Sequence, residues 1–158
     1  MSEKQEILKE LEREFKNLKK ELKLNIELEE LDEVFHIKNM VLSEGYVGEN
    51  LSRQICSRIS DTFGNWTGYL NNLVLPNSSY IPSQTEAKLF FSAEDKKRIW
   101  ALITGAMKLI SKNSLDIIKA DKILQKEIIE GSLIYWKEEF SPNVAKIMRR
   151  IHDAWAKD

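Results

Sequence analysis

The sequence contains very little cysteine, proline or glycine. Its single cysteine, Cys56, cannot form a disulfide bond within the chain. Three prolines and six glycines leave long stretches without a helix breaker, which favours long helices. The sequence also lacks a run of about 18 apolar residues, and its start, MSEKQEILKELEREF, lacks the apolar core of a signal peptide. We therefore expect a cytoplasmic protein that does not enter a membrane.

An excess of charge of one sign is absent as well. The 24 Lys and Arg residues nearly balance 25 Asp and Glu residues, so the net charge of −1 gives no general attraction to nucleic acid. Hydrophobic residues make up 42% and charged residues 31% of the chain, a composition typical of globular proteins. A chain of 158 residues has the length of one domain.

Apolar residues recur with a helical period along the whole sequence, and no alternating strand pattern competes with it. We predict an all-α fold: a single helical domain over residues 1–158, a bundle of about six or seven helices around a long central helix. Residues 1–24 form a heptad-patterned helix that either lies on this domain or protrudes from it.

The apolar residues of this first helix are spaced three and four residues apart. They are Leu8, Leu11, Phe15, Leu18 and Leu22. This spacing produces a narrow apolar seam, as in coiled coils, although two heptads are too few to establish one. The seam either packs on the chain's own domain or faces the same helix of a second subunit.

A second helix is predicted over residues 27–43, and Gly45 and Gly48 mark a turn after it. Asn50 is a suitable N-cap for the next helix, over residues 50–74. Apolar residues there recur every three or four positions: Leu51, Ile55, Ile59, Phe63, Trp66, Leu70 and Leu73. This is the strongest helical pattern in the sequence.

The opposite side of this long helix carries small and polar residues. They are Arg53, Ser57, Ser60, Gly64, Gly68 and Asn71. Each glycine costs a helix interior about 1 kcal/mol relative to alanine, so close contact on this side would explain both. The contact is with another helix of the chain, with a second copy, or with a ligand or peptide helix in a groove. The competing interpretation is a helix break at Gly64.

The second half of the sequence predicts shorter helices. Residues 75–86 form a loop with two prolines, and Ser83 with Glu86 predicts a capping box for a helix through Phe91. Ser92 predicts an N-cap for a helix to about residue 112, with an interruption at 111–114. A helix over 121–140 follows, and Ser141-Pro142 predicts the start of the last one.

Motifs for catalysis are few. Glu33 and His36 have the E-x-x-H spacing of a metal ligand pair, but the chain has only one other histidine, so a second copy of the motif cannot exist. Cys56 lies near the apolar side of its helix, where it is expected to act as a small hydrophobic residue. Phosphate-binding, dinucleotide-binding and hydrolase motifs are absent. We expect no metal and no cofactor, and an enzyme is the less favoured interpretation.

Basic residues offer a different hypothesis. Residues 76–119 carry seven Lys or Arg and four acidic residues. A nucleic-acid-associated subunit would contact phosphate through Lys96, Lys97, Arg98, Arg149 and Arg150.

The sequence therefore favours a non-catalytic helical interaction or scaffold protein. Its partner would be a second copy, giving a homo-oligomer, or another helical protein. Contact would involve the seam of residues 1–24 or the small-residue side of the helix at 50–74. The alternatives are the nucleic-acid-associated subunit, and a small-molecule binder or enzyme that uses this small-residue side.

Overall fold

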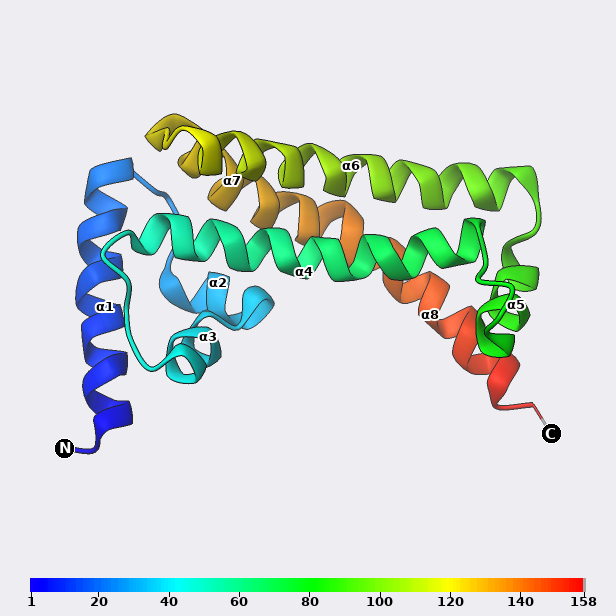
Figure 1. The fold of residues 1–158 in the computed structure, drawn as a ribbon, viewed down its shortest axis with the longest axis horizontal. Coiled ribbons are helices and arrows are strands. Elements are labelled where there is room, and N and C mark those ends of the chain that lie inside the picture. Colours follow the sequence, from blue (N-terminus) through cyan, green and yellow to red (C-terminus); the bar gives the residue numbers. More distant parts are fainter. Residues whose placement is uncertain (158) are drawn as a thin grey trace. The chain divides into compact units, whose positions relative to one another are not determined.

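The computed structural model describes residues 1–157, which are almost entirely helical and contain no strand. The prediction of an all-α helical bundle is confirmed (Figure 1). The chain divides into two compact units: Met1–Thr62 with Ser111–Leu133, and Phe63–Ile110 with Ile134–Asp158. The units are described in turn.

The first unit is built from six helical segments. They are α1 (Glu3–Leu22), α2 (Leu28–Phe35), α3 (Ile37–Glu44), the first half of α4 (Leu51–Val74), the end of α6 (Ala93–Ile118) and most of α7 (Lys122–Tyr135). Ser2 and Gln5 form a capping box at the start of α1, and Lys23 in the left-handed conformation ends it. The core includes Leu11, Leu31, Phe35, Ile37, Ile55 and Ile59, all fully buried.

The predicted helix over residues 27–43 is in fact two helices. His36 adopts a left-handed conformation, with φ of 54°, between α2 and α3. Phe35 and Ile37 are both completely buried, although in a continuous helix they would lie about 200° apart. The break brings both side chains into the core. The Asp32 carboxylate then accepts a hydrogen bond from the Lys38 backbone N–H at 2.8 Å, near the start of α3.

The second unit contains the remaining segments. They are the second half of α4, α5 (Ile81–Ala87), the 3₁₀ turn η1 (Lys88–Phe90), the first part of α6, the π-helical turn η2 (Trp136–Phe140) and α8 (Ser141–Trp155). Figure 1 shows α5 beside the end of α8. Glu86 of α5 accepts hydrogen bonds from Trp155 of α8 at 3.1 Å and from Tyr69 of α4 at 2.9 Å, so it links α5 to both helices.

The predicted capping box of Ser83 and Glu86 does not form. Helix α5 begins two residues earlier, with Pro82 in its first turn. Ser83 is buried, and its hydroxyl accepts a hydrogen bond from the Asn77 backbone N–H at 3.2 Å. By contrast, the predicted N-cap at Ser92 is present, since its hydroxyl accepts from the Asp95 N–H at 3.1 Å.

Helix α8 begins at Ser141 with Pro142 in its first turn, as the Ser141-Pro142 pair predicts, and it follows α7 and η2 with no loop between them. Proline cannot donate the usual backbone hydrogen bond and its ring crowds the preceding turn. The π-helical turn widens the helix at this point: the Ser141 N–H donates to the Trp136 carbonyl, five residues back. The Asn143 amide donates to the Glu139 carbonyl at 2.6 Å.

Helices α4 and α6 are both uninterrupted. Helix α4 continues through Gly64 and Gly68, so the predicted length of 50–74 is correct and the alternative break at Gly64 is wrong. Helix α6 extends to Ile118, beyond the interruption predicted at residues 111–114.

Candidate functional site

The small-residue side of α4 faces solvent in the second unit. Gly64 is partly exposed, and Gly68 and Asn71 are exposed. A Cβ atom built at Gly64 or Gly68 would meet no atom within 4 Å. Close packing with another helix of this chain, one of the interpretations of the sequence, therefore does not explain these glycines. The space beside them is open.

Helix α6 borders this side of α4. In the first unit the Arg53 guanidinium, on the same side of α4, donates to the Ile117 carbonyl of α6 at 3.1 Å. In the second unit Val74 near the end of α4 and Lys96 near the start of α6 line one groove, and Figure 1 shows the two helices running in opposite directions. At 1.5 Å per residue along both helices, Asn71 lies near the level of Trp100 and Gly64 near that of Met107.

Trp100 and Met107 lie on the solvent side of α6. Their exposed fractions are 60% and 45%, and Thr104 between them is also exposed. Both follow Lys96 at helical steps of four and seven, so they share the side of α6 that carries Lys96, which lines a groove with Val74 of α4. We call the surface formed by Gly64, Gly68 and Asn71 of α4 with Trp100, Thr104 and Met107 of α6 the α4–α6 face. It carries no charged residue.

The apolar seam of α1 is occupied within the first unit. Leu11, Phe15, Leu18 and Leu22 are buried, and Leu8 is partly buried. Helix α1 packs on α3. Of the two alternatives, the structure has the helix that lies on its own domain, and its seam presents little surface to a second subunit.

Arg53, at the other end of the small-residue side of α4, contacts residues of α6 within the first unit. Besides the Ile117 carbonyl, it approaches the buried Asp116 carboxylate, with 3.8 Å between Nε and Oδ2. Asp116 also accepts hydrogen bonds from the Gln125 amide at 3.0 Å and the Asp121 N–H at 2.8 Å. This network joins α4, α6 and α7. Ser57 and Ser60 are partly exposed on the same side.

Cys56 packs inside the same unit. Its thiol is fully buried and lies 3.8 Å from the Gln125 carbonyl. Burial, with a smaller contribution from the Asp116 carboxylate, raises the pKa of the Cys56 thiol to about 12. At neutral pH the thiol is therefore protonated, which is the opposite of what a nucleophile requires.

Of the basic residues predicted to contact phosphate, Arg98 and Arg150 line one pocket together with Asp95, and Lys96 lines a different groove. Lys96 sits over the Phe91 ring, at 5.0 Å from its centroid. Arg98 pairs with Glu94, and Arg150 binds Asp95 through two hydrogen bonds of 3.0 and 3.3 Å. Lys97 and Arg149 are exposed. Because Arg98 and Arg150 are already paired with carboxylates, phosphate would have to compete for them.

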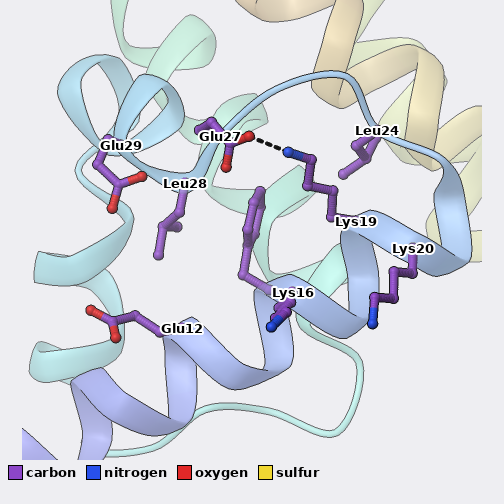
Figure 2. A pocket seen from close by; sticks show the side chains of 9 residues that line it. Glu12, Lys16, Lys19, Lys20, Leu24, Glu27, Leu28 and Glu29 are labelled. Atoms are coloured by element: carbon purple, nitrogen blue, oxygen red, sulfur yellow. Dashed lines mark hydrogen bonds and ion pairs between the residues drawn. The ribbon is translucent and has the colours of Figure 1, made fainter.

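A groove in the first unit lies between α1 and α2 and has a volume of about 560 Å³ (Figure 2). Phe15, Leu24 and Leu28 form its apolar base. Its other lining residues are three lysines and three glutamates: Lys16, Lys19, Lys20, Glu12, Glu27 and Glu29. Figure 2 shows Lys19 paired with Glu27. The balanced charge gives the groove no preference for a cation or an anion.

His36 lies exposed at the break between α2 and α3, so it shares no continuous helix with Glu33. Within residues 1–157, no group of three or more His, Cys, Asp or Glu side chains is arranged to hold a metal ion. In the same range, no helix is long and apolar enough to cross a membrane.

The sequence pattern did not reveal a close contact between α6 and α7 in the second unit. A Cβ atom at Gly105 would lie 2.1 Å from the Tyr135 hydroxyl oxygen. Tyr135 donates a hydrogen bond to the Leu102 carbonyl at 3.2 Å, and its ring stacks with Phe63 at 6.0 Å. A glycine inside the apolar pattern of α6 was the only available signal.

Comparison of the chain with protein-family models, with curated proteins and with solved structures gave no significant match.

Proposed function

We propose that this protein is a non-catalytic helical interaction protein that self-associates through the α4–α6 face. The observation that carries the proposal is the composition of this surface. In a chain with 31% charged residues, the face exposes Trp100 and Met107 and has no charge. Depletion of charge and enrichment of Trp and Met are typical of the centre of protein interfaces.

The absence of charge extends along the chain around the face. Residues 62–85, which include the second half of α4, contain no Asp, Glu, Lys or Arg. A solvent-exposed helix side is usually charged, as α1 is in this same chain. The exposed residues of this half of α4 are instead Asn65, Gly68, Asn71 and Asn72.

A second copy is the partner that fits this face best. A twofold interface uses the same surface of both subunits. Each copy must therefore contribute protruding side chains and also the open positions that receive the side chains of the other copy. Trp100 and Met107 protrude from α6, and the open positions beside Gly64 and Gly68 supply the space. In the dimer, the Trp100 side chain of each copy would pack against the glycines of the other.

The solution mass of point variants tests the proposal. We expect light scattering to give twice the 18.4 kDa of one chain at micromolar concentration, and Trp100→Asp to give a monomer. Ile134→Asp is the matched control, because Ile134 is an exposed apolar residue of the same unit that lies on α7. Wild-type protein that stays monomeric at high concentration would refute self-association. Equal masses for Trp100→Asp and Ile134→Asp would refute the assignment of the dimer interface to the α4–α6 face.

A further inference from the structure

A second groove lies in the second unit, where α4 ends and the connection to α6 begins. Its volume is about 320 Å³. Leu73, Val74 and Ala87 form its base, and Phe91 forms one wall with 77% of the residue exposed. A large aromatic side chain exposed to this extent beside an apolar groove is typical of a binding surface.

The loop that forms the opposite wall is fixed by local hydrogen bonds. The Asn77 side chain accepts from the Ser79 N–H at 2.9 Å, and Asn77 donates its own N–H to Ser83 at 3.2 Å. The Gln84 amide donates to the Ser78 carbonyl at 2.6 Å. These contacts hold Pro76 and Ser78 in place, so the groove exists before any ligand enters it.

The charge of the groove is of one sign. Lys88 and Lys96 both line it, and no lining residue carries a carboxylate. The Lys96 ammonium lies 5.0 Å from the centroid of the Phe91 ring, which places a cation directly beside the apolar wall. This separates the groove from the one between α1 and α2, where lysines and glutamates balance.

We propose that this groove binds a small amphiphilic carboxylate. The apolar chain of the ligand would lie on Leu73, Val74 and Ala87, and its carboxylate would pair with Lys88 and Lys96. A volume of about 320 Å³ is at the lower end of the range for small-molecule sites, about 300–1,000 Å³, which suits a short chain. The groove shares no residue with the α4–α6 face, and ligand binding in it does not depend on self-association.

Three probes of the same chain length test the proposal: octanoate, octan-1-ol and octylammonium. Each is titrated into the full-length protein while backbone amide NMR shifts are recorded. We expect saturable octanoate binding with the largest shifts at Leu73, Val74, Ala87 and Phe91. The dissociation constant should be at least fivefold lower for octanoate than for octan-1-ol, and octylammonium should bind most weakly.

Two variants identify the source of this preference. Lys88→Gln combined with Lys96→Gln should weaken octanoate binding at least fivefold and leave octan-1-ol binding unchanged. Lys97→Gln removes a neighbouring lysine that does not line the groove, and it should change neither. Equal affinities for the three probes, absence of saturation, or largest shifts at other residues would overturn the proposal. So would an equal response of the double variant and Lys97→Gln.

Discussion

Replacing Gly105 with alanine tests the packing of the second unit most sharply. In a helix interior this substitution normally stabilises a protein by about 1 kcal/mol. Here the new Cβ atom would lie 2.1 Å from the Tyr135 hydroxyl oxygen and 2.4 Å from the ring carbon that bears it. Both distances are far below van der Waals contact, so Tyr135 has to move.

The free-energy cost of moving Tyr135 depends on the contacts that hold its ring. Tyr135 would lose its hydrogen bond to the Leu102 carbonyl, which contributes about 1 kcal/mol. Its ring also packs against Phe63 and Phe140, at centroid distances of 6.0 and 5.8 Å. Overpacking at such a site costs about 1–3 kcal/mol. After the helix-propensity gain is subtracted, we expect Gly105→Ala to lower the free energy of unfolding by about 1–3 kcal/mol.

Urea unfolding followed by circular dichroism measures this effect, and Gly131→Ala is the control. Gly131 also lies inside a helix, but a Cβ there would meet no atom within 4 Å, so its replacement should stabilise by about 1 kcal/mol. In a Tyr135→Ala background, Gly105→Ala should become stabilising as well. If Gly105→Ala stabilises the wild-type chain as much as Gly131→Ala does, the reasoning is wrong.

Two further predictions concern ionisable groups. Burial raises the pKa of Cys56 above its ordinary value of 9.0 to about 12, so stability from the neutral thiol is present below pH 9 and declines as the pH rises towards 12. Urea unfolding at pH 8–11 should show a smaller decline for Cys56→Ala, and an unchanged slope would contradict this assignment. The hydrogen bonds from Arg150 lower the pKa of Asp95, so their stabilisation is present at neutral pH and is lost as the pH falls through the carboxyl range. Arg150→Ala should lower the free energy of unfolding by about 1 kcal/mol at pH 7 and reduce its dependence on acid pH. Arg98→Ala should change the free energy of unfolding by no more than about 0.5 kcal/mol. Equal losses for the two variants would contradict the role assigned to Arg150.

The helices were predictable because their signal is local. The apolar period over residues 51–73 follows directly from which side of α4 is buried, and the Ser92 N-cap depends on neighbours three residues away. The break at His36 was not predictable in this way. It occurs because Phe35 and Ile37 are both buried, and only the tertiary structure decides that.

The glycines show the same limit for the candidate site. Gly64 and Gly68 suggested close packing from their spacing, yet a Cβ atom built at either position would meet no atom of another described helix within 4 Å. The sequence pattern did not mark Gly105, yet the close approach of the Tyr135 hydroxyl requires a residue without a Cβ atom at this position. A glycine contacts a partner distant in sequence, so its role depends on which helix lies opposite. The Ser141-Pro142 pair predicted the start of α8 correctly, but it gave no sign of the π-helical turn that joins α7 to α8 without a loop.

The polar network around Asp116 was missed because its members are far apart in sequence. Arg53, Asp116 and Gln125 come from three helices, and none has a motif that marks it. The uncharged character of residues 62–85 was visible in the sequence. That Trp100 of α6 lies near the level of Asn71 of α4 depends on the antiparallel arrangement of the two helices, which the sequence does not show.

The most direct test of self-association is the solution molar mass of the wild type and of a variant with Gly64→Leu and Gly68→Leu, measured by light scattering across a dilution series. The leucines meet no atom of their own chain at Cβ and favour the helix, so the variant should fold at least as stably. We predict a wild-type dimer that dissociates on dilution and a variant that is monomeric throughout. A wild type that is monomeric at every concentration, or a variant that dimerises as the wild type does, would contradict the account.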